Sequence, residues 1–244
     1  MALRGVILAG SKGARLGELT RVTNKYLLPV GPSPMVYYPI KKLVGAGVRD
    51  ILLVVGREHA GDLLELLGSG REHQCNLMYR VQDQASGIAH ALGLAQVFAH
   101  DERVLVLPGD NVFYDPLGEL VAHASLKPQQ AWVMLKQVRD PQHFAVAELK
   151  TSTIVGIEDK PKKPKSDLAV VGIYLYPPDV FRIIKKVKPG SRGEPEISDV
   201  NRYYLEHNRL SSVMLRGYWT DAGTPEALAA ANELVTAQPP LFGH

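Results

Sequence analysis

The first half of the chain alternates short, nearly continuous apolar runs with segments whose apolar residues recur every three or four positions. Residues 3–9 and 50–55 are apolar runs that each end at a glycine, as is typical of buried parallel strands. Between them, residues 35–44 have helical spacing and are followed by Gly45 and Gly47, which suit the end of a helix. The alternation continues with expected helices at 60–67 and 87–98 and expected strands at 77–81 and 103–107. Strand and helix in regular alternation predict a doubly wound α/β sheet.

The pattern changes after about residue 115, where strand-like runs follow one another with few helices between them. These strands are expected at residues 131–138, 144–149, 153–158 and 168–176. Late helices are expected at residues 178–187, 197–206 and 225–235. The last of these has Thr224 as its N-cap and Pro225 as its first helical residue. We therefore predict one domain over residues 1–244, of Rossmann-like type, with a mixed sheet.

Composition narrows the class of protein. A chain of 244 residues that is 45% hydrophobic can form one full-sized core. The 28 basic and 25 acidic residues are dispersed and give a net charge of +3, which favours neither nucleic acid nor a membrane surface as a partner. Cys75 is the single cysteine, so no internal disulfide can form. No apolar run approaches the roughly 18 to 20 residues that span a bilayer, and we expect a cytoplasmic protein.

A glycine-rich turn follows the first predicted strand, with the sequence Gly-Ser-Lys-Gly-Ala-Arg from Gly10 to Arg15. Glycines let such a turn close tightly and bring backbone N–H groups near an anion, so we predict a phosphate-binding loop. The spacing differs from the Gly-x-Gly-x-x-Gly of dinucleotide-binding folds, which argues against an NAD-dependent dehydrogenase, and the turn lacks the Gly-Lys-Ser/Thr ending of a P-loop. Arg15 and Lys25 lie near this turn in the sequence and are suited to stabilising phosphate charge.

Two aspartates are candidates for a metal site. Asp110 follows a predicted buried strand, at the edge where α/β sheets bind their ligands. Asp221 lies in a short turn before the last helix. Mg²⁺ prefers oxygen ligands and is commonly held by one or two carboxylates together with phosphate oxygens. We therefore predict that Asp110 and Asp221 hold Mg²⁺ beside a bound nucleotide.

These motifs resemble those of the sugar-1-phosphate nucleotidyltransferases. Residues 8–16 are similar to the glycine-rich opening of that family, and residues 24–30 to its Ser/Thr-Lys-x-Leu-Leu-Pro segment. Further segments that resemble the family, in the same order, are Val81-Gln82 with residues 87–91, then residues 107–114, 159–161, 192–199 and 219–224. The resemblance runs from about residue 3 to about residue 235. Within the family it is greatest to the enzymes that transfer a thymidylyl group to glucose 1-phosphate.

The resemblance implies a fold of the nucleotide-diphospho-sugar transferase type, and it implies a nucleotidyl-transfer reaction. The nucleotide-binding half would cover about residues 1–115 and the sugar-binding half about residues 116–238. Glucose 1-phosphate would attack the α-phosphate of dTTP in line, with Mg²⁺, giving dTDP-glucose and pyrophosphate. No general base is required, because the attacking phosphate is already ionised near pH 7. Arg15, Lys25 and Asp110 would be the catalytic residues.

Two sets of binding residues follow from the same resemblance. The residues implied to contact the nucleotide are Leu8, Ala9, Gly10, Ser11, Gly13, Ala14, Arg15, Lys25, Gln82, Gly87 and Asp110. The residues implied to contact the sugar phosphate are Asn111, Ala145, Asp159, Lys160, Val171, Arg192 and Glu196.

The chain departs from the family pattern at four of these positions. Ser11 and Ala14 stand where the family has its second glycine and a threonine in the loop. Ala145 stands where the family has a glycine, and Asp159 replaces a glutamate. UTP or another sugar phosphate therefore remains an alternative substrate, and a nucleotide-sugar sensor without turnover remains an alternative function. Retention of both basic residues and both aspartates argues against the sensor.

Two further expectations concern regulation by a second nucleotide site and the oligomeric state. Longer family members continue beyond the last helix with an extension that helps to form a regulatory nucleotide site, whereas this sequence ends soon after that helix. We therefore expect no feedback inhibition through such a site. We expect a homo-oligomer by analogy with the family.

Overall fold

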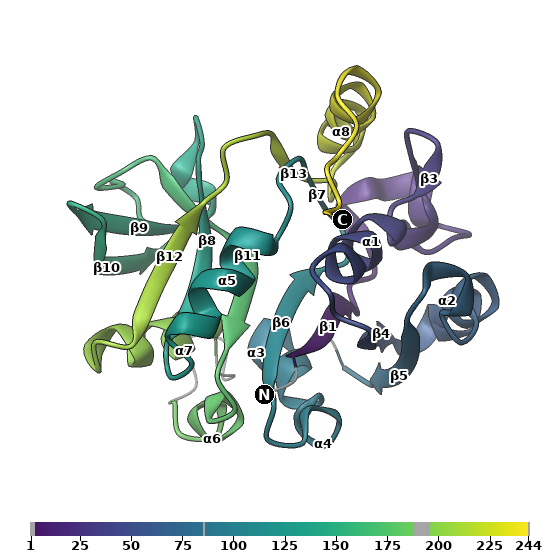
Figure 1. Cartoon of the computed structure of the whole chain (residues 1–244). Coiled ribbons are helices and arrows are strands. Elements are labelled where there is room, and N and C mark those ends of the chain that lie inside the picture. Colours follow the sequence, from purple (N-terminus) through teal and green to yellow (C-terminus); the bar gives the residue numbers. More distant parts are fainter. Residues whose placement is uncertain (1–2, 85, 188–195, 244) are drawn as a thin grey trace. The chain divides into compact units, whose positions relative to one another are not determined.

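The computed structural model describes residues 3–84, 86–187 and 196–243, which form two compact units (Figure 1). Unit A contains residues 3–84, 107–118 and 216–243, and unit B contains residues 86–106 and 119–215 apart from the undescribed positions. Each unit thus combines segments that lie far apart in the sequence. The predicted division into two functional halves near residue 115 stays a prediction.

The elements of unit A are strands and helices drawn from three parts of the chain. Its strands are β1 (Leu3–Ala9), β2 (Pro29–Val30), β3 (Ser33–Pro34), β4 (Asp50–Gly56), β5 (Asn76–Gln82), β7 (Asn111–Phe113) and β13 (Trp219–Asp221). Its helices are α1 (Tyr37–Gly45), α2 (Ala60–Leu67) and α8 (Pro225–Ala237), with a short 3₁₀ turn η1 (Ala14–Thr20) and another, η2 (Lys25–Leu27). Thr224 caps α8 by accepting the N–H of Ala227, as predicted.

Strands β1, β4 and β5 are parallel neighbours, with Ile7 opposite Leu53 and Val54 opposite Arg80. Residues 51–55 of β4 are all buried, which explains why this strand is a continuous apolar run rather than an alternating one. Because the strands are parallel, their carboxyl ends lie at one edge of the sheet. The turn that starts at Gly10 and the side chain of Gln82 therefore meet at that edge.

Unit B is built on a mixed sheet. Its strands are β6 (Arg103–Pro108), whose last two residues belong to unit A, β8 (Ala131–Gln137), β9 (Ala145–Lys150), β10 (Thr153–Asp159), β11 (Leu168–Tyr176) and β12 (Leu210–Met214). Its helices are α3 (Gly87–Gly93), α4 (Gln96–Ala99), α5 (Gly118–Leu126), α6 (Val180–Ile184) and α7 (Ile197–Glu206).

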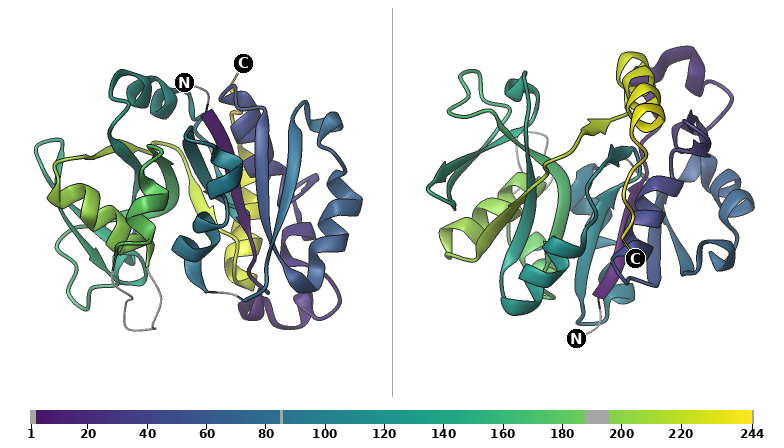
Figure 2. Two further views of the ribbon diagram at one scale, coloured as in Figure 1. Left: turned by 90° about the horizontal axis from the view of Figure 1, so that it is seen from below. Right: turned by 45° about the horizontal axis from the view of Figure 1, so that its top comes forward.

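Strand β11 organises unit B, because it pairs antiparallel with β6, β8 and β9. Strand β12 runs parallel to β8, and β9 and β10 form an antiparallel hairpin (Figures 1 and 2). Helices α3, α6 and α7 contact one another. The sheet of unit B is therefore mixed, as predicted for the second half of the chain.

Some predicted elements differ from the observed ones. The helix expected at residues 87–98 is interrupted, since α3 ends at Gly93 and α4 begins only at Gln96, and glycine is a weak helix former. The helix expected at 178–187 is the shorter α6. Strands β7, β12 and β13 and helix α5 were not predicted. Strands β7 and β13 have three residues each, too few to show a periodic pattern.

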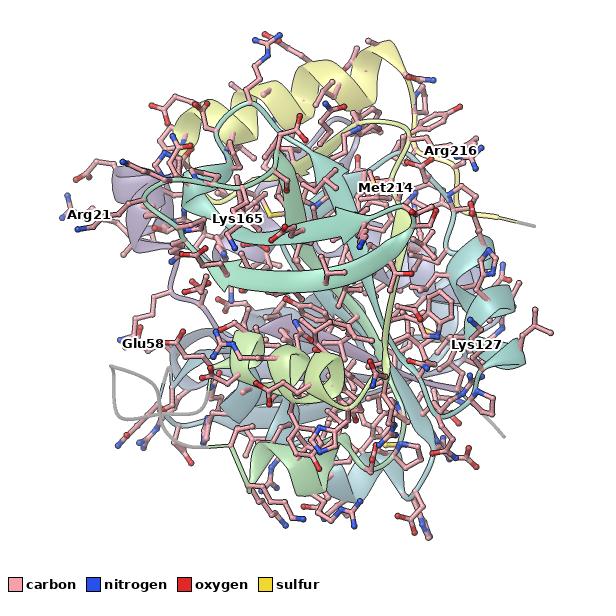
Figure 3. All side chains as sticks on the ribbon, turned by 90° about the vertical axis from the view of Figure 1, so that its left-hand side faces the viewer. Arg21, Glu58, Lys127, Lys165, Met214 and Arg216 are labelled. Carbon is pink, nitrogen blue, oxygen red and sulfur yellow. The ribbon has the colours of Figure 1, made fainter. Side chains whose placement is uncertain are left out.

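Most charged side chains lie on the surface and the core is largely apolar, with a few exceptions. Long charged side chains such as those of Arg21 and Glu58 extend away from the ribbon (Figure 3). In the part of the chain that the structure describes, no helix is both long enough and apolar enough to cross a membrane. One exception is Lys42 of α1, which is fully buried.

Lys42 fixes the C-terminal segment of unit A. Its ammonium group donates to the carbonyl oxygens of Tyr114 at 2.8 Å, Asp115 at 2.7 Å and Leu241 at 2.6 Å. The segment after α8 therefore lies back along α1 (Figure 2), where Gly45 leaves space for the carbonyl of Phe242. Burial lowers the pKa of Lys42 from 10.5 to about 7, and the neighbouring Asp115 opposes this change.

We expect the pH dependence of stability to change when Lys42 is replaced by Met. Because its folded-state pKa of about 7 lies below the ordinary value of 10.5, the unfolded chain binds more protons between these pH values. The free energy of unfolding of the wild type, relative to Lys42→Met, should therefore rise by roughly 1 to 3 kcal/mol between pH 7 and 10. Urea unfolding at several pH values measures this difference, and parallel curves for the two proteins would contradict it.

Candidate functional site

The turn after β1 is closed by two glycines with different requirements. A Cβ atom on Gly10 would lie 2.5 Å from Oε1 of Gln82, so glycine leaves space for that side chain. Gly13 has φ 71°, a left-handed conformation that favours glycine. The N–H of Ser11 donates to the hydroxyl of Tyr26 at 3.2 Å, and the N–H of Gly13 donates to Oγ of Ser11 at 3.3 Å. The predicted loop is thus a tight turn beside Gln82, and two of its N–H groups have acceptors within the chain.

The second basic segment packs against this turn. Asn24 caps η2 by accepting a backbone N–H at 2.9 Å, which sets the direction of the residues that follow. The side chain of Lys25 is only 3% exposed and forms an ion pair with the carboxylate of Asp110. A Cβ atom on Gly13 would lie 3.0 Å from Cβ of Lys25. The glycine turn, Lys25 and Asp110 therefore meet at one place in unit A.

Asp110 is held by hydrogen bonds as well as by charge. It follows β6, and its Oδ1 accepts the Nδ2 of Asn111 at 3.2 Å. The Oδ1 of Asn111 in turn accepts Nε1 of Trp219 at 2.7 Å. In the β7–β13 ribbon, Asn111 lies opposite Asp221, and the N–H of Ala222 donates to the carbonyl of Asp110 at 3.0 Å. This short ribbon brings the two predicted metal ligands together from positions more than 100 residues apart.

Asp221 lies in an environment that disfavours its charge. Burial raises its pKa, the nearby carboxylate of Asp110 raises it further, and Arg15 and Lys25 act in the opposite direction. Arg15 approaches Oδ2 at 3.6 Å, while Oδ1 is buried without a hydrogen-bond partner. A Cβ atom on Gly223 would lie 2.7 Å from Nη2 of Arg15, so this glycine leaves space for the guanidinium.

These observations fit a divalent cation that prefers oxygen. Two carboxylates repel each other, and one buried oxygen of Asp221 has no partner. Across the described residues, three or more His, Cys, Asp or Glu side chains nowhere gather into a metal-binding group. Two carboxylates without further protein ligands suit Mg²⁺, which completes its shell with water and phosphate oxygens. Asp110 and Asp221 are the residues that would hold it.

The other predicted nucleotide residues lie along the same elements, except one. Leu8 and Ala9 are the buried end of β1, and the carbonyl of Leu8 accepts the N–H of Gly109 at 2.9 Å. Ala14 is the first residue of η1. Gly87 belongs to unit B, where it begins α3 with φ 79°.

The predicted sugar-phosphate residues that the structure describes, apart from Asn111, fall in unit B. Ala145 and Asp159 lie directly opposite each other in the β9–β10 hairpin and therefore point to one face of it. Lys160 follows with φ 43°, which is uncommon for a residue with a side chain, and its N–H donates to the carbonyl of Phe144 at 3.0 Å. Such strain is often found at functional sites.

Three further residues complete this set. Val171 is buried in β11, beside Gly172 with φ 78°, where the pairing of β11 with β8 shifts its register. Glu196 is half-buried just before α7. Arg192 lies outside the described residues. The structure therefore groups Ala145, Asp159 and Lys160 on one hairpin, and the binding roles of the whole set stay predictions.

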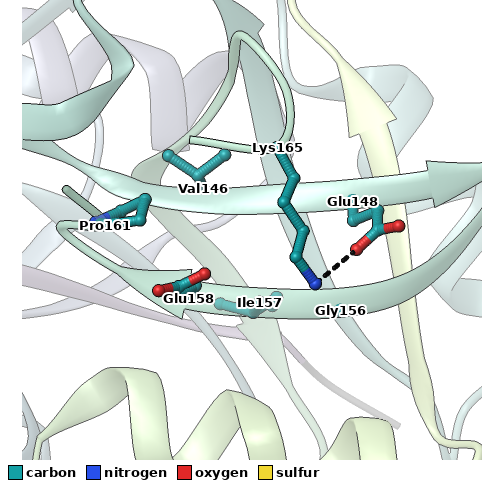
Figure 4. Close-up of a pocket in the computed structure, with 7 residues that line it drawn as sticks. All are labelled: Val146, Glu148, Gly156, Ile157, Glu158, Pro161 and Lys165. Carbon is teal, nitrogen blue, oxygen red and sulfur yellow. Dashed lines mark ion pairs between the residues drawn. The ribbon is translucent and has the colours of Figure 1, made fainter. Parts of the chain in front are cut away.

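A small cavity lies against the same hairpin (Figure 4). It has a volume of about 200 Å³ and is lined by Val146, Glu148, Gly156, Ile157, Glu158, Pro161 and Lys165. Lys165 and Glu148 form an ion pair of 3.4 Å across it. Side chains alternate along a strand, so Val146 and Glu148 point away from the face of Ala145. Ile157, which also lines the cavity, lies on the face of Ala145 and Asp159, but Ala145, Asp159 and Lys160 do not line it.

Sequence reasoning missed four residues that shape the centre in unit A. They are Asn24, Tyr26, Trp219 and Gly223. Asn24 could have been found from the sequence, because an asparagine often caps the backbone N–H two residues later in the chain. The roles of the other three depend on contacts between distant segments, which no local pattern reveals.

Comparison with known proteins gives the family. The family described as Nucleotidyl transferase matches residues 4–238. A glucose-1-phosphate thymidylyltransferase from Neisseria meningitidis (serogroup A, serotype 4A) is 40% identical over 237 residues, covering 96% of this chain and 82% of that protein.

Solved structures agree with this match. A candidate glucose-1-phosphate thymidylyltransferase from Bacillus anthracis, in complex with a sucrose, has a TM-score of 0.93 and 46% identity, covering 100% of this chain and 98% of that one. A UDP-glucose pyrophosphorylase complexed with UDP-glucose has a TM-score of 0.83 at 24% identity, covering 97% and 99%, and shows a shared fold. The predicted doubly wound α/β fold is confirmed. The chain belongs to the nucleotidyl transferase family and is a nucleotidyltransferase.

Proposed function

We propose that this protein transfers a thymidylyl group from dTTP to glucose 1-phosphate and releases pyrophosphate. The observation that carries the proposal is the centre in unit A, where the glycine turn, Lys25 and Arg15 converge on Asp110 and Asp221. The names of the relatives support the choice of nucleotide and sugar phosphate.

The reaction requires several negative charges to approach one another. A sugar phosphate must attack the α-phosphorus of a triphosphate, and the charge that develops on the phosphoryl oxygens must be neutralised. Lys25 is buried and fixed by Asn24 and Asp110, so its ammonium needs little reorganisation to stabilise that charge. Arg15 is mostly exposed and can follow the pyrophosphate as it leaves.

Asp110 and Asp221 would hold Mg²⁺. When bound, this ion neutralises charge on the phosphate oxygens. The protein contributes the ligand geometry, since Asn111 fixes one oxygen of Asp110 and Gly223 leaves space for Arg15 beside Asp221. The environment of Asp221 supports this role, because a cation would relieve the repulsion between the two carboxylates.

The remaining assignments concern the base and the sugar phosphate. Gln82 can both donate to and accept from a pyrimidine edge, and it lies beside Gly10 of the turn. Asn111, Ala145, Asp159, Lys160, Val171, Arg192 and Glu196 are proposed to contact the sugar phosphate, as implied by the family pattern. A cytoplasmic location and a homo-oligomeric assembly stay predictions.

A pyrophosphate-release assay with four triphosphates and several hexose 1-phosphates tests the proposed reaction. We expect the highest kcat/KM with dTTP and glucose 1-phosphate. UTP is the expected second substrate, because one methyl group on the base is worth only about 1 kcal/mol of discrimination. Absence of turnover with every pair would sink the proposal and favour a sensor.

Asp110→Asn should lower kcat by more than about a hundredfold, because it removes charge where the metal and phosphates meet. The fold should persist, as judged by circular dichroism, but with a lower melting temperature, because the buried Lys25 loses its charged partner. Asp62→Asn, at an exposed position in the first turn of α2, is the matched control and should keep wild-type kcat. Wild-type turnover by Asp110→Asn would refute the metal assignment.

Mg²⁺ should raise the melting temperature of the wild type, and Asp221→Asn should abolish this rise. The folded-state pKa of Asp221 lies above its ordinary value, so its ionised form costs stability at neutral pH, and that cost disappears as the pH falls through the raised pKa. Since a proton competes with Mg²⁺ for the same oxygen, the stabilisation by Mg²⁺ should weaken over that pH range. Thermal unfolding with and without Mg²⁺ from pH 4 to 8 measures both effects. An Asp221→Asn protein with the full Mg²⁺ shift would contradict the assignment.

A further inference from the structure

Tyr26 is a buried phenol at the centre of unit A that the proposed reaction leaves without a role. It is 2% exposed, and its hydroxyl oxygen accepts the N–H of Ser11 at 3.2 Å. Its ring lies 4.8 Å from Nζ of Lys25, and a Cβ atom on Gly109 would lie 2.8 Å from its Cε1. The ring thus occupies the space between the glycine turn, Lys25 and the residue before Asp110.

The hydroxyl proton of Tyr26 has no acceptor among the described residues. A phenol both accepts and donates hydrogen bonds, and here the described contacts use only its accepting capacity. A buried donor without an acceptor is costly, so such a group is expected to find a partner. Burial raises the pKa of Tyr26 well above its ordinary value, and the charges of Asp110 and Asp221 add to this effect. The group therefore keeps its proton at neutral and mildly alkaline pH.

The surroundings of this hydroxyl indicate which acceptor it would meet. It accepts the N–H of Ser11 in the glycine turn, and its ring contacts Lys25, the cation beside Asp110. All of these groups are the ones expected around a phosphate. The motif Ser/Thr-Lys-x-Leu-Leu-Pro does not specify the residue at this position, which is Tyr26 in this sequence.

We propose that Tyr26 is a nucleotide-binding residue whose hydroxyl donates a hydrogen bond to a non-bridging phosphate oxygen of the triphosphate. The inference rests on the proposed function, because it requires a triphosphate in the centre of unit A. In this arrangement the N–H of Ser11 polarises the phenol, and the phenol passes a hydrogen bond on to the ligand. The Ser11 N–H is engaged by Tyr26 and cannot bind the phosphate directly, and the Tyr26 hydroxyl provides a hydrogen bond to the phosphate in its place.

Tyr26→Phe tests the proposal, because it removes the hydroxyl and keeps the ring against Gly109 and Lys25. A hydrogen bond to a charged oxygen is involved, so kcat/KM for the triphosphate should fall about tenfold to a hundredfold. The KM for the sugar phosphate should stay within about twofold of the wild type, since that substrate does not meet the hydroxyl. Titration calorimetry with the triphosphate should show a matching loss of affinity.

Tyr38→Phe is the matched control. Tyr38 is another buried tyrosine of unit A, and its hydroxyl donates to the carbonyl of Val30. Its replacement should lower the melting temperature and leave kcat/KM for the triphosphate unchanged. Wild-type triphosphate affinity in Tyr26→Phe, or an equal loss for both substrates with a lower melting temperature, would overturn the proposal.

A fluorinated tyrosine at position 26 gives a second readout if Tyr26→Phe does not fold. Fluorine on the ring makes the phenol more acidic and therefore a stronger hydrogen-bond donor while it stays protonated. Triphosphate affinity near neutral pH should therefore rise relative to the wild type, and an unchanged or lower affinity would contradict the proposal. Failure of the wild type to bind any of the four triphosphates would instead refute the proposed function, and the inference with it.

Discussion

The buried ion pair between Lys25 and Asp110 joins the two segments on which the centre of unit A depends. Removing one partner of such a pair typically costs roughly 3 to 5 kcal/mol, because the other charge is left buried. Each partner is fixed independently, Lys25 by the capped turn at Asn24 and Asp110 by Asn111. The pair therefore ties the position of the glycine turn to the position of the carboxylates.

The second constraint is the repulsion between Asp110 and Asp221. The β7–β13 ribbon places them together at the expense of a raised pKa for Asp221 and a buried oxygen without a partner. Such an arrangement is unfavourable in isolation, and its natural explanation is a ligand that supplies positive charge. The glycines at positions 13 and 223 serve the same centre, since each leaves space for a basic side chain.

The sugar-side residues show a different kind of organisation. Ala145 and Asp159 are cross-strand neighbours in the β9–β10 hairpin, and Lys160 continues from it in a strained conformation. Two departures from the family pattern, Ala145 and Asp159, therefore lie opposite each other. A methyl group gained on one strand faces a methylene lost on the other, which suggests compensation in volume rather than two independent losses.

The parallel strands, most helices and the family could be predicted from the sequence, because they depend on local periodicity and on motifs in a fixed order. Strands β1, β4 and β11 and helices α2 and α7 lie where their apolar patterns predicted them. The sequence motifs around Asp110 and Asp221 suggested that these two residues form a metal site. Contacts between distant segments reveal that a ribbon of two three-residue strands joins them, that Tyr26 accepts the Ser11 N–H, and that Lys42 is buried under the C-terminal segment. Each of these contacts joins residues with no periodic relation in the sequence, and their burial and pKa values arise only when distant segments exclude water together.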